Sequence, residues 1–287
     1  MKVVVTGASG YLGSQVVAAL VEAGYEVAAI ARHRDPAASP AVRWYLGDMR
    51  QMDLSEPLQG ANAVVHLIGI IRENPQEGVT FDAIHVGVTE RLVHAMQTHQ
   101  VSRVVHMSAL GTRAGARAQY HRTKWQAEQR LLASGLDVTI LRPSLIFGGQ
   151  PPFFLMLRDL ARLPRTPVPG DGHTLFQPVA RTDVAQMVRS ALDDETTIGL
   201  TLELGGPDRY SLNELFDHMA RGLGKRRAHK VHLPLGLVGA VAQLSRYLPV
   251  PITPDQLAML TEGNVTDDRR WHQWVSHPEG MASWYPE

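Results

Sequence analysis

The chain has 287 residues, of which 44% are hydrophobic, and its 28 lysines and arginines are balanced by 28 aspartates and glutamates. This balance excludes an overall basic charge that would recruit nucleic acid, and the lack of cysteine excludes disulfides, thiol nucleophiles and thiolate metal sites. Because no apolar run reaches the ~20 residues of a membrane helix, we predict a cytoplasmic protein of one large domain, or one domain with an appendage.

The first thirty residues predict a strand, a glycine-rich turn, a helix and a second strand. Val3–Val5 form a β-branched run, apolar residues then recur at helical spacing, and residues 26–31 are again typical of a strand. A turn between a strand and a helix exposes backbone N–H groups at the positive end of the helix dipole, where a pyrophosphate fits. Gly7, Gly10 and Gly13 occupy this turn and are candidate cofactor residues, with a purely structural tight turn as the alternative.

The alternation of strands and helices continues to about residue 143. Strands are predicted at 63–68, 103–107 and 137–141, and helices at about 86–99 and 120–134. Strands separated by helices imply a parallel sheet with helices on both faces. The predicted fold class is therefore α/β, with a Rossmann-type doubly wound parallel sheet.

Prolines and glycines cluster in residues 150–172, where this alternation ends. Later segments predict a strand at 200–204 and a helix at 211–223 that begins with a capping box. We expect residues 1–150 to form the dinucleotide-binding core, with 177–204 returning to it, and residues 151–176 and 205–287 to form a small C-terminal α+β substrate or lid region.

Tyr120 and Lys124 are a candidate pair for proton transfer. Residues four apart on a helix lie on one face, so the phenol and the ammonium would point the same way. A nearby cation lowers the pKa of a tyrosine and suits it to protonate a developing alkoxide. A surface pair that merely has helical spacing is the alternative.

Seven segments together resemble the short-chain dehydrogenase/reductase superfamily, most closely its extended and atypical branches. In chain order they are TGASGYLG (6–13), GDM (47–49), VVHLIG (64–69), HMSALG (106–111), YHRTK (120–124), LRPSLIFG (141–148) and QPVARTDVA (177–185). The MSALGT segment and residues 249–265 are most similar to the atypical group that includes the nucleotide-binding accessory subunit of respiratory complex I and its bacterial relatives.

The resemblance implies roles for individual residues. Tyr120 would be the catalytic acid, Lys124 would hold the nicotinamide ribose, and Asp48 would lie beside the adenine. Ser108 is the candidate for polarising a substrate carbonyl, although it lies slightly before the family's usual position and a structural role stays open. The implied cofactor-binding set is Gly7, Ser9, Gly10, Tyr11, Leu12, Gly13, Asp48, Met49, Leu67, Ile68, Gly69, Lys124, Pro143 and Ser144.

The end of the second predicted strand indicates the cofactor. An NAD site usually places an acidic residue there to accept hydrogen bonds from the ribose 2′-hydroxyl. Here Arg32 and Arg34 come first, and Asp35 lies beyond them. Two guanidinium groups suit a 2′-phosphate, so we predict NADP(H) as the preferred cofactor and keep NAD(H) as the alternative. A solvated pair of arginines is the competing interpretation.

Two departures from the family leave the reaction open, namely the place of Ser108 and the sequence His85-Val-Gly-Val-Thr89 where an asparagine often stands. One hypothesis is an NADP(H)-dependent oxidoreductase, or an epimerase-like enzyme, that acts on a hydrophobic carbonyl or quinone-like small molecule. The other is a non-catalytic NADP(H)-binding structural or regulatory protein linked to a respiratory complex or to quinone metabolism.

Residues 233–260 carry wide apolar stripes. They can cover a substrate cleft, or they can rest on a partner protein or a membrane, which would make the protein peripheral to that membrane. Among the thirteen histidines no pair has metal-ligand spacing with a helping carboxylate, and His66 and His106 lie in apolar strands. The sequence therefore predicts no metal site.

Overall fold

The structure is a computed structural model that describes residues 1–246 and 252–285. Its centre is a seven-stranded sheet in the order β11-β6-β5-β4-β1-β2-β3, and every neighbouring pair is parallel. The strands are β1 (Lys2–Thr6), β2 (Glu26–Ala31), β3 (Arg43–Leu46), β4 (Ala63–His66), β5 (Arg103–Met107), β6 (Asp137–Pro143) and β11 (Thr201–Leu204). The order reverses beside β1, which is the place where doubly wound sheets bind ligands.

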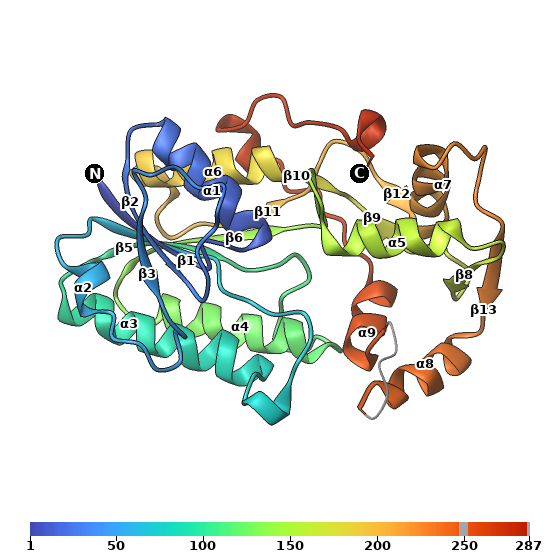
Figure 1. The fold of residues 1–287 in the computed structure, drawn as a ribbon, viewed down its shortest axis with the longest axis horizontal. Helices are drawn as coiled ribbons and strands as arrows, with labels where there is room; N and C mark the ends of the chain where they lie inside the picture. The colour runs from blue at the N-terminus through green and yellow to red at the C-terminus, as the bar shows by residue number, and fades with distance from the viewer. Residues whose placement is uncertain (247–251, 286–287) are drawn as a thin grey trace.

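Helices cover both faces of this sheet, as Figure 1 shows. On one face lie α1 (Tyr11–Glu22) and α6 (Arg181–Asp193), and on the other α2 (Ser55–Leu58), α3 (Val88–Thr98) and α4 (Gln119–Leu132). Val3 and Val5 pack with the residues of α1 and α6, whereas Val4 packs with those of α3, because successive side chains of a strand point to opposite faces. The predicted doubly wound α/β fold is confirmed.

A smaller C-terminal part lies beside the carboxyl ends of the strands (Figure 1). It contains α5 (Pro152–Arg162) and α7 (Leu212–Gly222), which pack around their own core with Phe154 and Phe216 fully buried. Three two-stranded sheets surround them: β7 (Ile146–Phe147) with β10 (Val179–Ala180), β8 (Thr166–Pro169) with β13 (Lys230–Leu233), and β9 (Leu175–Phe176) with β12 (Tyr210–Ser211). Helices α8 (Leu235–Gln243) and α9 (Pro254–Glu262) follow.

Several elements differ from those expected. Strand β3 was not predicted, and a π-helical turn, Asp82–Gly87, precedes α3. Within residues 177–204, which the sequence predicts to return to the core, α6 packs on the main sheet and β11 belongs to it, whereas β10 pairs with β7 instead. The capping box of α7 is confirmed. The beginning of the 249–265 segment lies outside the described residues.

Candidate functional site

The glycine-rich turn after β1 has a backbone that requires its glycines. Gly7 has a φ of +70°, in the left-handed region that favours glycine. A Cβ on Gly10 would lie 3.1 Å from the Gly7 carbonyl oxygen, and one on Gly13 only 2.1 Å from the same atom. The turn therefore brings the start of α1 directly onto the end of β1 and leaves the N-terminus of the helix open to an anion.

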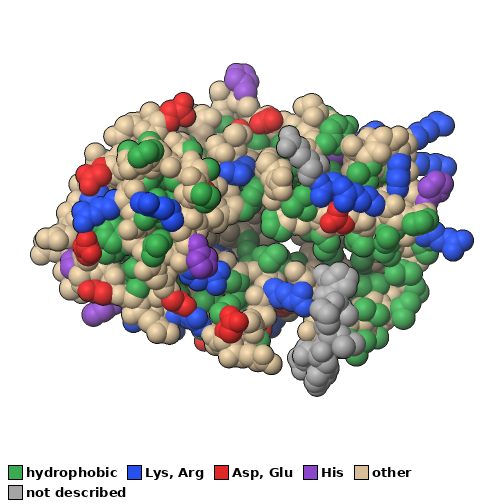
Figure 2. Space-filling model, in the orientation of Figure 1, with side chains coloured by type: hydrophobic (Ala, Val, Ile, Leu, Met, Phe, Trp, Pro, Cys, Tyr) green, Lys and Arg blue, Asp and Glu red, His purple; other side chains and the backbone are tan. Residues whose placement is uncertain are grey.

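A cavity of about 450 Å³ opens beside this turn, at the carboxyl ends of β1, β2, β3 and β4. Figure 2 shows the surface hollowed between the part of the molecule that carries the sheet and the part that carries α5. Nine of the predicted cofactor residues line the cavity: Gly7, Ser9, Gly10, Arg32, Asp48, Met49, Leu67, Ile68 and Gly69. Its glycine cradle and its position at the topological switch point fit a dinucleotide.

Two further arginines line the cavity, Arg50 and Arg72, and the sequence analysis missed both. Arg50 Nε donates to Asp48 Oδ2 over 2.9 Å, while Arg50 Nη1 donates to the Glu77 carbonyl oxygen over 2.8 Å. The hydrogen bonds from Arg50 hold the pKa of Asp48 below its ordinary value, and Arg32 lowers it further. Asp48 is thus an anchored anion at the adenine end predicted for the cavity. The position of Arg50, two residues after Asp48, was the available signal.

The other predicted cofactor residues do not line this cavity. The Tyr11 hydroxyl donates to the Gly148 carbonyl oxygen over 2.7 Å, and the Arg181 guanidinium lies 5.0 Å from the centre of its ring. Leu12 packs into the core beneath α1, and Arg34 is exposed. The remaining four outside the lining are Gly13, Lys124, Pro143 and Ser144.

Lys124 nevertheless reaches the edge of the cavity. Its Nζ donates to the carbonyl oxygens of Met107 over 3.0 Å and Ile68 over 3.3 Å, and a Cβ on Gly69 would lie 3.0 Å from it. The side chain is buried, and this desolvation lowers the pKa of Lys124 to about 8. The ammonium therefore sits at the ends of β4 and β5, where the cavity meets α4.

Tyr120 packs in an aromatic group near Lys124. Its ring makes edge contacts with His85 and His121, with centroids 5.3 Å apart in both cases, and with Phe81 at 6.0 Å. A Cβ on Gly69 would lie 3.6 Å from His85 Nε2, so His85 connects the tyrosine to the cavity. The sequence predicts a lowered pKa for Tyr120, and this prediction is wrong. Burial, and secondarily the charge of Asp255, raises the pKa of Tyr120 to about 12.

Helix α9 caps the first turn of α4, which carries Tyr120. The Asp255 carboxylate accepts hydrogen bonds from the backbone N–H of Gln119 over 2.6 Å and of Tyr120 over 3.0 Å. Glu262 accepts from the backbone N–H of Arg117 over 2.9 Å, and its carboxylate lies 3.5 Å from His121 Nδ1. These acids are favourable at the positive end of the α4 dipole. The sequence analysis gave Asp255 and Glu262 no role, since nothing local links them to α4.

Ser108 and Ser144 form internal hydrogen bonds. The Ser108 hydroxyl lies 3.3 Å from the Thr112 hydroxyl, and both residues are buried. The Ser144 hydroxyl donates to the side chain of Asn264, which also donates to the Leu110 carbonyl oxygen over 3.2 Å. The C-terminal segment thus joins the chain after β5 to the chain after β6, where Ser144 of the implied cofactor-binding set lies.

Two buried histidines lie in neighbouring strands. His66 and His106 stack with centroids 5.2 Å apart, and the His66 ring lies within hydrogen-bonding distance of the Thr6 and Thr89 hydroxyls. Burial lowers the pKa of His66 to about 3, so its ring is neutral. Within residues 1–246 and 252–285 no group of three or more histidines and acids is arranged to hold a metal ion. The helices described in the same ranges include none with the length and apolar character needed to span a bilayer.

Comparisons with known proteins agree with this geometry. Residues 7–195 match the model of a family described as NAD(P)H-binding. The mitochondrial NADH dehydrogenase [ubiquinone] 1 alpha subcomplex subunit 9 of Arabidopsis thaliana is 28% identical over 91% of this chain and 68% of its own length. The mitochondrial 40 kDa subunit of NADH-ubiquinone oxidoreductase from Neurospora crassa is 27% identical over 97% of this chain and 72% of its own.

Solved structures share the fold. A nucleoside-diphosphate-sugar epimerase from Staphylococcus aureus aligns with a TM-score of 0.77 at 19% identity, covering 99% of both chains. MoeE5 in complex with UDP-glucose and NAD aligns with a TM-score of 0.74 at 23% identity, covering 98% of this chain and 94% of that one. These structures show the fold, and the family match over residues 7–195 shows that the chain belongs to the NAD(P)H-binding family.

Proposed function

We propose that the chain is an NADP(H)-dependent oxidoreductase that acts on a hydrophobic carbonyl or quinone-like substrate, with Tyr120 as the acid. The observation that carries the proposal is the junction at Gly69, where the dinucleotide-type cavity meets the Lys124 ammonium and, through His85, the Tyr120 ring. A buried lysine at the edge of the cavity, with a tyrosine reached through His85, favours chemistry over nucleotide binding alone.

Different residues of the cavity would bind different parts of the cofactor. The glycine-rich turn and the N-terminus of α1 would hold the pyrophosphate, and Asp48 the adenine end. Arg32 and Arg72 also line the cavity and, within the described part of the chain, neither forms an ion pair with a carboxylate. Their charge is therefore available to a ribose 2′-phosphate, which favours NADP(H) over NAD(H). When bound, this cofactor supplies or accepts the hydride.

Tyr120 and Lys124 would manage the proton. With a pKa of about 12 the phenol keeps its proton at neutral pH, so it can donate that proton to the oxygen of a substrate as negative charge develops there. Lys124 has a pKa of about 8, so its ammonium can stay charged beside the nicotinamide ribose and can also exchange a proton near neutral pH. An epimerase-like reaction would use the same residues.

Cofactor preference is tested by replacing Arg32. We expect Arg32→Ala to raise the Kd of NADPH at least about tenfold, the loss of about 1.4 kcal/mol of charge-assisted bonding, and to leave the Kd of NADH nearly unchanged. Arg34→Ala is the matched control, because Arg34 is exposed and does not line the cavity. Equal losses for both nucleotides would contradict a 2′-phosphate role for Arg32.

Catalysis is tested by following the oxidation of NADPH and NADH with a panel of quinones and carbonyl compounds. We expect Tyr120→Phe to abolish the rate while NADPH binding, measured by calorimetry, survives, because the phenol is the proton donor and is not part of the cavity lining. A rate that persists in Tyr120→Phe would refute the assignment of Tyr120 as the acid.

A second candidate is a non-catalytic NADP(H)-binding protein that supports a partner in a respiratory complex or in quinone metabolism. The observation that favours it is Ser108, whose hydroxyl contacts Thr112 and is buried, so that it offers little to a substrate carbonyl. The two curated relatives named above are subunits of NADH dehydrogenases. Saturable NADPH binding with no rate in the wild type or in Tyr120→Phe would favour this candidate.

A further inference from the structure

Helix α8 presents a stripe of apolar side chains to solvent. Residues 235–243 include no charged residue. Leu237 and Val241 of α8 and Leu244, which directly follows the helix with helical backbone angles, recur at positions i, i+4 and i+7 and so lie on one side. They are 54%, 40% and 46% exposed, whereas Val238 and Ala242 on the other side are buried. We call Leu237, Val241 and Leu244 the apolar stripe. An exposed stripe of this kind marks an interaction surface.

A group of arginines lies at the other end of the strand that leads into α8. Arg226 and Arg227 shortly precede β13, and Arg165 directly precedes its partner strand β8. The three arginines line two adjoining hollows of about 550 and 440 Å³. All three are exposed and, within the described residues, form no ion pair with a carboxylate. We call them the basic cluster.

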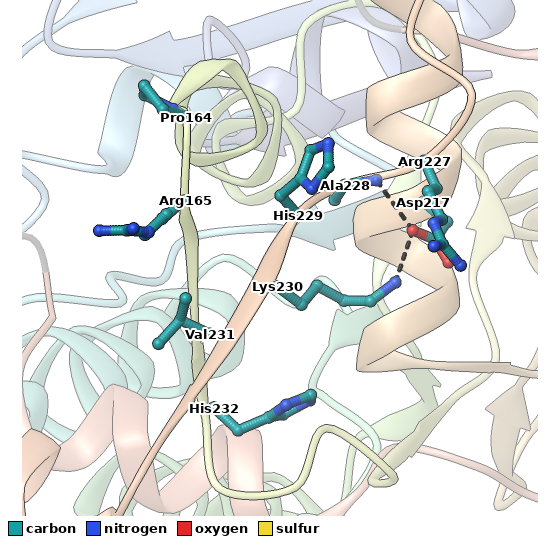
Figure 3. A pocket seen from close by; sticks show the side chains of 9 residues that line it. All are labelled: Pro164, Arg165, Asp217, Arg227, Ala228, His229, Lys230, Val231 and His232. Atoms are coloured by element: carbon teal, nitrogen blue, oxygen red, sulfur yellow. Dashed lines mark hydrogen bonds and ion pairs between the residues drawn. The ribbon is translucent and has the colours of Figure 1, made fainter.

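The acid that lines the same hollow as Arg165 and Arg227 already has hydrogen-bond partners. Asp217 accepts from Lys230 Nζ and from the backbone N–H of Ala228, as the dashed lines of Figure 3 show. In the same view Arg165 extends to the opposite side of the paired strands from Lys230. Among residues 1–246 and 252–285, the arginines of the basic cluster are therefore not paired with a carboxylate.

The basic cluster and the apolar stripe lie toward opposite ends of β13, along one edge of the molecule. Figure 2 shows Lys and Arg side chains projecting from the right-hand edge and hydrophobic side chains gathered lower on that edge, over α8. Leu163 and Val231, which are 44% and 41% exposed, lie beside the arginines and extend the apolar surface toward them. Uncompensated cations next to exposed leucine and valine side chains match the two layers of an anionic bilayer, its phosphates and its acyl chains.

We propose that the apolar stripe and the basic cluster form a binding surface for an anionic phospholipid membrane. The stripe enters the boundary between headgroups and acyl chains, and the arginines contact lipid phosphates. A soluble protein partner would need a row of acidic side chains opposite the arginines and an apolar groove opposite the stripe. An anionic bilayer presents negative charge and an apolar layer everywhere on its surface, and it needs no hydrogen-bonding groups on the stripe.

Helix α9 lies between the proposed surface and the candidate active site and contacts both. A Cβ on Gly239 of α8 would lie 3.9 Å from Leu257 of α9, and α9 caps the first turn of α4 through Asp255. A lipophilic substrate dissolved in the bilayer would thus meet the protein beside the C-terminal part that borders Tyr120. The membrane proposal does not depend on this catalysis and is tested without it.

The test is co-sedimentation of the purified full chain with vesicles of phosphatidylcholine, with and without phosphatidylglycerol, at low and at physiological salt. We expect binding to the anionic vesicles that weakens with salt, and at least tenfold weaker binding to pure phosphatidylcholine. Leu237→Glu should abolish binding, and Arg226→Ala with Arg227→Ala should weaken it about 25-fold, since each lost charge corresponds to about 1 kcal/mol.

Two control variants show whether vesicle binding belongs to this surface. Leu132→Glu changes a leucine on α4 that is 48% exposed, and Arg189→Glu an exposed arginine on α6, and both variants should bind vesicles like the wild type. NADPH affinity should be unchanged in every variant, which shows that the fold is intact. Equal binding to both kinds of vesicle, release by inorganic phosphate, wild-type binding by Leu237→Glu, or a dimer that Leu237→Glu converts to a monomer would each overturn the proposal.

Discussion

Gly13→Ala provides a stringent test of the cofactor turn. The added methyl group would lie 2.1 Å from the Gly7 carbonyl oxygen and 2.8 Å from that of Ala8, short of the 3.0 Å below which real Cβ contacts are essentially never found. The first gap must therefore widen by about 0.9 Å, and both obstacles are backbone atoms that no rotamer change can move. Helix α1, which buries Val16 and Leu20 against the sheet, has to shift as a whole.

Overpacking of this kind costs about 1–3 kcal/mol, and we expect the upper end because backbone is involved. In thermal unfolding this corresponds to a fall in Tm of about 2–4 °C for each kcal/mol. The Kd for NADPH, measured by fluorescence titration, should rise at least about tenfold because the turn and the start of α1 no longer lie together. Gly115→Ala is the control, since a Cβ there meets nothing within 4 Å. Wild-type Tm and NADPH affinity in Gly13→Ala would refute the reasoning.

Three further predictions concern charge. Burial lowers the pKa of Lys124 from 10.5 to about 8, so between pH 8 and 10.5 the unfolded chain binds more protons than the folded chain, and the free energy of unfolding rises with pH. In urea titrations over this range, the wild type should gain up to about 3 kcal/mol relative to Lys124→Met. Asp255→Ala should reduce the unfolding free energy by about 1–2 kcal/mol through loss of the α4 cap, whereas Asp267→Ala, at an exposed ion pair, should change it by less than about 0.5 kcal/mol. The pKa of His66 is lowered to about 3, so as the pH falls below 6.5 the unfolded chain takes up a proton at this residue and the folded chain does not, which destabilises the fold. The unfolding free energy of His66→Asn should therefore fall less steeply with decreasing pH than that of the wild type, by about 1.4 kcal/mol per pH unit. Parallel pH dependences of the two unfolding free energies would contradict a neutral buried His66.

Local patterns were sufficient for most of the sheet and for the cofactor turn. Buried strands such as Val3–Val5 are apolar runs, and the spacing of Gly7, Gly10 and Gly13 places them between a strand and a helix, so both features are readable without tertiary information. Strand β3 was missed because it is only four residues long and has one buried side chain, Tyr45, which leaves no periodicity to detect.

The electrostatics of the site could not be predicted in the same way. Helical spacing correctly placed Tyr120 and Lys124 on one helix, but it says nothing of burial, and burial raises one pKa and lowers the other. Asp255, which caps that helix, is 135 residues away from Tyr120 in sequence. Arg50 could have been found beside Asp48, because a basic residue two positions after an acid is a local signal.

The late position of the residues that cap α4 has a consequence for how the protein is made. The last strand of the main sheet, β11, ends at Leu204, whereas Asp255 and Glu262 come well after it in the chain. Chains generally fold from the N-terminal end as they are synthesised. We therefore expect the emerging polypeptide to assemble the sheet and the nucleotide cavity while the turn before Tyr120 still lacks its acceptors. On the ribosome, competence to hold a cofactor would precede the completed tyrosine site.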